Sequence, residues 1–144
     1  MAKAILLNVA PLLVAASAAV VLFLGIVHLL FTFRGSKLHP RDAALLQALR
    51  NTPLVISRKT TFWRAWTGFN ASHSFGAILF GLIYFYLALW APQLLFGTWF
   101  LRIVGLALLL GYDFLAFRYW FSGPLRYLVL ATILYAAGLV AAVL

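Results

Sequence analysis

Cysteine is absent from this sequence of 144 residues, and charged residues make up only 9% of it. Without cysteine the chain has no disulfide, no thiolate metal ligand and no cysteine nucleophile. A phosphate-binding glycine loop, a zinc-binding HExxH motif and the Ser-His-Asp pattern of hydrolases are missing as well. The familiar sequence signatures of several enzyme and metalloprotein classes are therefore excluded.

Hydrophobic residues, in contrast, account for 66% of the sequence. A soluble domain usually has about a quarter of its residues charged, and one of this length could not bury so much apolar surface. The surrounding solvent must therefore be lipid. The net charge of +9 would suggest nucleic acid in a soluble protein, but here the basic residues lie beside apolar runs. We expect anionic lipid headgroups as their partner, and no nucleic acid.

Four apolar runs are each long enough to cross a bilayer, which takes about 20 residues. They predict helices over about residues 5–33, 63–90, 99–120 and 124–144 of a single transmembrane domain, 1–144. The first run is too long for a signal peptide, so an uncleaved helix is expected. All five tryptophans fall at the ends of these runs, where indoles prefer to lie. The expected fold is an all-α membrane protein, an up-down bundle of four transmembrane helices.

The eleven lysines and arginines are distributed unevenly between the two sides of this bundle. Only Lys3 and Arg102 belong to one side. The other side has Arg34, Lys37, Arg41, Arg50, Arg58, Lys59, Arg64, Arg118 and Arg126. Because cytoplasmic loops are enriched in Lys and Arg, the connections that hold these nine are expected in the cytoplasm and both termini outside.

The basic loop over residues 34–62 contains a short helical pattern. Pro40 is suited to a first helical turn, residues 41–50 place three leucines on one side, and Pro53 ends the pattern. One interpretation is a short amphipathic helix on the cytoplasmic face of the membrane. The other is an ordered loop without any role at the lipid surface.

Three ionisable residues, His28, His73 and Asp113, lie inside the apolar runs. Such groups are costly in lipid and are functional candidates by default. At about 1.5 Å per helical residue, each lies roughly 8 to 13 Å below the arginines at the cytoplasmic end of its helix. This matched depth predicts that three helices bring them to one polar, ligand-binding site. The other residues expected there are Thr32, Asn70, Ser72 and Tyr112.

Gly68, Ser72 and Gly76 form a row of small residues at intervals of four. Such a row lets helix backbones approach closely, which favours association in lipid. We expect this face to pack against the first or the third predicted helix. Small-residue faces could equally serve a second copy of the chain or a larger membrane complex.

The ionisable residues suit several chemistries, which the sequence leaves open. His28 and His73 can bind a b-type haem or, with Asp113, a non-haem iron or zinc. An Asp–His pair can also act as acid and base on a lipophilic substrate, or relay a proton. In the structural alternative, the histidines only hydrogen-bond across helix interfaces and the carboxylate only neutralises an arginine. Catalytic residues and cofactors are therefore unassigned.

Three motifs resemble signatures of small bacterial inner-membrane proteins: GIVHL at residues 25–29, GFNASHS at 68–74 and RYWFSGP at 118–124. In layout the chain is similar to the DoxX-like four-helix proteins. This resemblance is one of topology, so it implies a multi-pass location in the bacterial inner membrane and no role for individual residues.

The function expected from these features is binding of a lipid, a quinone or another apolar small molecule in a polar pocket of the cytoplasmic half. One alternative is a non-catalytic accessory subunit of a larger membrane complex. The other is a redox protein with bound haem or metal, which an absorption spectrum would distinguish.

The charge distribution predicts opposite locations for the C-terminus and the first loop. Alkaline phosphatase, which is active only outside the cytoplasm, should be active when fused after Leu144 and inactive when inserted within residues 41–50. A reporter that is active only in the cytoplasm should give the reverse pattern. Matching locations, or a cytoplasmic C-terminus, would refute the orientation.

Overall fold

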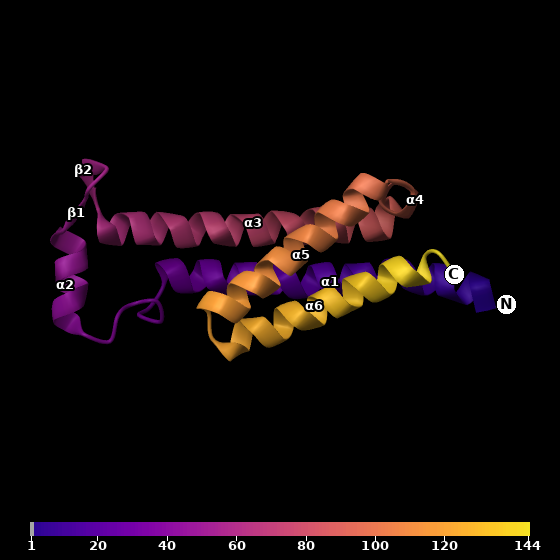
Figure 1. The fold of residues 1–144 in the computed structure, drawn as a ribbon, viewed down its shortest axis with the longest axis horizontal. Coiled ribbons are helices and arrows are strands. Elements are labelled where there is room, and N and C mark those ends of the chain that lie inside the picture. The colour runs from indigo at the N-terminus through magenta and orange to yellow at the C-terminus, as the bar shows by residue number, and fades with distance from the viewer. Residues whose placement is uncertain (1) are drawn as a thin grey trace. The chain divides into compact units, whose positions relative to one another are not determined.

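The computed structural model describes residues 2–144, with side chains from Val9 onward. Among these residues, four helices are long and apolar enough to cross a membrane: α1, α3, α5 and α6. A mainly helical, multi-pass membrane protein is thereby confirmed. In chain order (Figure 1), the elements are α1 (Ala2–Phe33), α2 (Ala43–Asn51), β1 (Pro53–Leu54), β2 (Ser57–Thr61), α3 (Phe62–Trp90), α4 (Pro92–Gly97), α5 (Trp99–Tyr119) and α6 (Ser122–Ala141). The side chain of Lys3, expected outside, lies beyond those described.

The short helix expected in the basic loop is α2, but it begins later than the sequence pattern indicates. Asp42 is its N-cap, and its Oδ1 accepts hydrogen bonds from the backbone N–H groups of Ala44 at 2.8 Å and Leu45 at 3.3 Å. This carboxylate satisfies two of the unpaired donors at the helix start. Pro40 therefore precedes the helix, and its assignment to the first turn is wrong.

Three short elements lie where the sequence predicted only connections. β1 and β2 pair antiparallel, with the Cα atoms of Pro53 and Thr61 opposite each other. The Phe62 N–H donates to the Thr52 carbonyl at 2.9 Å, which continues this pairing to the start of α3. α4, with Pro92 in its first turn, fills the connection between α3 and α5.

The chain divides into two compact units. The core unit comprises Met1–Leu24 and Ala77–Leu144, and the basic unit comprises Gly25–Gly76. The boundary between them falls within α1 and within α3. Each unit is described below by itself.

Small residues mark the helix contacts of the core unit. On α6, Gly138 leaves room for α1, because a Cβ there would lie 2.7 Å from Val14 Cγ2 and 3.0 Å from the Ala10 carbonyl oxygen. The buried hydroxyl of Ser17 on α1 donates to the Ala131 carbonyl of α6 at 2.7 Å. Close backbone approach and hydrogen bonds across helices are the usual sources of helix association in lipid.

Gly81 on α3 gives the sharpest test of this packing. A Cβ at Gly81 would lie 2.5 Å from Leu22 Cβ and 2.8 Å from Leu22 Cα on α1, so Gly81→Ala must displace backbone. It should lower the free energy of unfolding by about 1–3 kcal/mol, measured by denaturant titration in detergent.

The matched control is Gly111→Ala on α5, where a Cβ would meet no atom within 4 Å. There the better helix propensity of alanine should leave stability unchanged or raise it by up to about 1 kcal/mol. Equal stabilities of the two variants would contradict the close α1–α3 contact.

Candidate functional site

The histidine cluster of the basic unit consists of His28 on α1 and of Asn70 and His73 on α3. His28 Nε2 lies 3.0 Å from Asn70 Oδ1. The rings of His28 and His73 meet edge to face, with centroids 5.4 Å apart and an interplanar angle of 88°. Because an amide oxygen can only accept, Nε2 of His28 is the nitrogen that carries the proton and donates it. The structure thus brings two of the three ionisable residues together.

Asn70 is fixed in orientation by its own helix. Its Nδ2 donates to the Trp66 carbonyl at 2.8 Å, one turn earlier, so its Oδ1 is the atom left to face His28. The Ser74 hydroxyl donates in turn to the Asn70 carbonyl at 2.9 Å. Asn70 and Ser74 are both buried. This chain of bonds holds the amide that orients the His28 ring, a role for Trp66 and Ser74 that the sequence analysis did not predict.

Two hydroxyls that the sequence placed in the site bond to backbone of their own helices. Thr32 Oγ1 donates to the His28 carbonyl at 2.8 Å, and Ser72 Oγ donates to the Phe69 carbonyl at 2.9 Å. Such bonds satisfy a hydroxyl locally without presenting it to a ligand. Ser72 is also exposed, whereas the rings of His28 and His73 are half-buried.

The row of small residues on α3 lies on an exposed side of the helix. Gly68, Ser72 and Gly76 are all exposed, and a Cβ at Gly68 would meet no atom within 4 Å. The row was expected to pack closely against another helix of this chain. Gly68 makes no such contact. A spacing of four places residues on one face of a helix but does not fix the direction in which that face points.

Asp113 and Tyr112, the remaining predicted site residues, belong to the core unit. The Thr132 hydroxyl of α6 lies 2.8 Å from Asp113 Oδ2 and 3.1 Å from the Leu128 carbonyl, and its single proton must serve both acceptors. Oδ1 of Asp113 is buried and, among the described residues, has no hydrogen-bond partner. The convergence of Asp113 with the two histidines stays a prediction.

A pair of buried tyrosines links three helices in the core unit. Tyr84 Oη of α3 donates to the Leu101 carbonyl of α5 at 2.7 Å. Tyr135 Oη of α6 lies 3.4 Å from the same carbonyl oxygen and 3.3 Å from that of Arg102. A Cβ at Gly105 would overlap the Tyr135 hydroxyl and the Tyr84 ring, so only glycine admits both phenols there. These contacts organise the packing of the core unit.

The histidine cluster fits a metal or a haem poorly. Nε2 of His28, the nitrogen that usually ligates haem iron, is committed to Asn70. Among the residues that the structure describes, no group of three or more His, Cys, Asp or Glu side chains could hold a metal ion. The geometry instead favours the cluster as a hydrogen-bonding site.

The bond between His28 and Asn70 predicts a measurable coupling. In a double-mutant cycle with His28→Ala and Asn70→Ala, the double mutant should lose less unfolding free energy than the two single mutants together. The difference should be about 0.6 kcal/mol, and at most about 1.7 kcal/mol. A second cycle, pairing His28→Ala with Thr67→Ala, is the control, since Thr67 Oγ1 bonds the Trp63 carbonyl of its own helix. Additivity in both cycles would refute the predicted coupling.

Comparisons of this chain with protein-family models, with curated proteins and with solved structures find no match. The similarity in layout to the DoxX-like proteins therefore stays a prediction. The function has to be argued from the geometry of the two units.

Proposed function

We propose that this multi-pass membrane protein binds a lipophilic small molecule with a polar head, such as a quinone or a lipid, at the histidine cluster. The observation that carries the proposal is the meeting of two imidazoles from separate helices, one of them oriented by a buried asparagine. Ionisable groups within membrane spans are costly, and their concentration at one point favours a binding role.

The ring nitrogens of the cluster support a ligand that both donates and accepts hydrogen bonds. When neutral, His28 donates its Nε2–H to Asn70 Oδ1 and keeps a lone pair on Nδ1 that can accept a hydrogen bond from a hydroxyl. A neutral imidazole, such as that of His73, has one N–H donor and one acceptor nitrogen. A quinone and its quinol offer carbonyl and hydroxyl groups of these two kinds.

The surroundings of the cluster suit an apolar ligand body. Ile26 and Leu30 on α1 and Phe69 on α3, which neighbour the cluster residues in sequence, are exposed. A lipophilic molecule dissolved in the bilayer can thus approach along apolar surface. The distribution of basic residues supports an orientation with the basic unit toward the cytoplasm of a bacterial inner membrane.

A role as accessory subunit is the second candidate, and the open row of small residues favours it. Gly68, Ser72 and Gly76 leave a face of α3 uncovered in this chain, and such faces admit a partner helix closely. Recovery of a stoichiometric membrane partner in mild detergent, lost on Gly68→Leu, would favour this candidate.

The ligand proposal is tested with the chain purified in mild detergent and a short-chain benzoquinone as probe. Binding, followed by quenching of tryptophan fluorescence, should be saturable. His73→Phe keeps an aromatic ring but removes both nitrogens, so it should raise the Kd about tenfold, which corresponds to the loss of one good hydrogen bond.

The matched control is Tyr127→Phe, which removes a polar atom from an exposed ring on α6. This variant should bind the quinone with the wild-type Kd. Quenching that does not saturate, or equal Kd values for the wild type and His73→Phe, would overturn the proposal for this ligand class.

A further inference from the structure

The basic unit contains a second feature, separate from the histidine cluster, that we call the interfacial groove. It is a cavity of about 340 Å³ with walls from the loop before α2, from α2 and from the start of α3. Leu38, Leu49, Phe62, Trp63 and Trp66 make these walls apolar, and the ring of His39 lies among them. A space of this size accommodates part of a lipid-sized molecule.

The groove lies at the end of a membrane span. The span of α3 begins at Phe62, so Trp63 and Trp66 occupy its first turns. Tryptophan at such a position marks the level of the lipid headgroups. The groove is therefore placed where an acyl chain meets its polar head.

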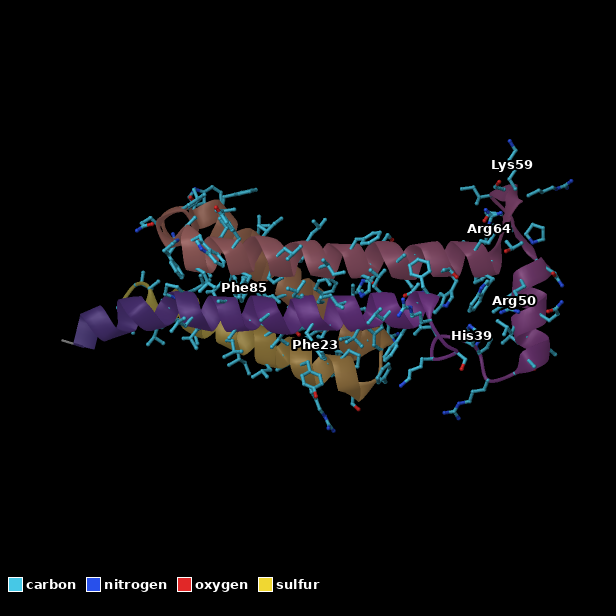
Figure 2. All side chains as sticks on the ribbon, turned by 180° about the vertical axis from the view of Figure 1, so that it is seen from behind. Phe23, His39, Arg50, Lys59, Arg64 and Phe85 are labelled. Atoms are coloured by element: carbon cyan, nitrogen blue, oxygen red, sulfur yellow. The ribbon has the colours of Figure 1, made fainter. Side chains whose placement is uncertain are left out.

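Arg50 and His39 both contact the aromatic wall of the groove. The Arg50 guanidinium carbon lies 5.8 Å from the centre of the Trp63 ring, and the His39 ring meets the same indole edge to face at 5.0 Å. Figure 2 shows Arg50, His39 and Arg64 at the same end of the basic unit. A guanidinium held over an indole keeps its N–H donors for a second partner, and phosphate matches their geometry.

Most of the positive charge of this unit has no counter-charge within the unit. Gly25–Gly76 contains seven lysines and arginines and a single acidic residue, Asp42. The Asp42 carboxylate is engaged by the N–H groups at the start of α2. Because the anion missing from the chain must come from its surroundings, the adjacent membrane surface is the natural source.

We propose that the interfacial groove binds one anionic phospholipid, with its phosphate at Arg50 and His39 and an acyl segment along Trp63 and Trp66. Apolar walls distinguish this ligand from free phosphate, which gains nothing from them. The charge distinguishes it from a zwitterionic lipid, whose headgroup carries no net charge to meet the cations.

The test uses the full chain in mixed micelles with phospholipids whose acyl chains carry bromine, which quenches nearby tryptophans. Phosphatidylglycerol should quench at lower concentration than phosphatidylcholine with the same chains. Arg50→Gln should reduce this preference about fivefold, the effect of one basic residue at an anionic membrane surface. Arg50 is exposed, so this substitution should leave the fold intact.

Arg58→Gln is the matched control. Neither arginine is part of the groove lining, but the Arg50 guanidinium lies over the ring of Trp63, which does line it, whereas Arg58 is an exposed arginine on β2. It should leave the preference for phosphatidylglycerol at the wild-type value. Glycerol 1-phosphate, which has the charge without the chains, should not displace the lipid. An equal loss of preference in both variants would show diffuse attraction and overturn the proposal. Displacement of the lipid by glycerol 1-phosphate, or an unchanged preference in Arg50→Gln, would overturn it as well.

His73→Phe should not alter the preference for phosphatidylglycerol, so this result is independent of quinone binding.

Discussion

Lipid supplies no hydrogen-bond donors or acceptors, so each polar side chain within a membrane-spanning helix needs a partner in the protein or in a ligand. Several of the described side chains meet this constraint in one of two ways. Some hydroxyls, such as that of Thr32, bond to the preceding turn of their own helix. Others bridge helices, as Asn70 does to His28 and Thr132 does to Asp113. The bridging bonds are the ones that specify how helices are paired.

The same constraint separates structural polar groups from candidate functional ones. Tyr84, Tyr135 and Ser17 each donate to a backbone carbonyl of a neighbouring helix and are thereby satisfied. The histidine cluster is different, because two ionisable rings from separate helices meet edge to face there and a buried amide orients one of them. The cost of placing two ionisable rings together within membrane spans is the physical reason for proposing a ligand at the histidine cluster.

The interfacial groove and the histidine cluster lie on consecutive turns of α3. Trp66 takes part in both, since its ring lines the groove and its carbonyl holds Asn70. A lipid seated on this indole would contact the helical turn that orients His28. The basic unit thus combines a basic, aromatic surface at the start of the α3 span with a cluster of polar side chains further along it.

The sequence by itself determined the four spans, because length and hydropathy are properties of each segment alone. The ends of α3 and α5 lie within one residue of the expected ones, and α2 lies inside the basic loop. Depth along a helix is likewise a one-dimensional quantity, which is why His28 and His73 could be expected at one level.

The tertiary structure decided how each helix is turned about its axis. That rotation leaves Gly68 exposed, gives Asp113 the partner Thr132 and directs Tyr135 to carbonyls of α5. It follows from the packing of several helices at once, and no single segment of the sequence contains that information.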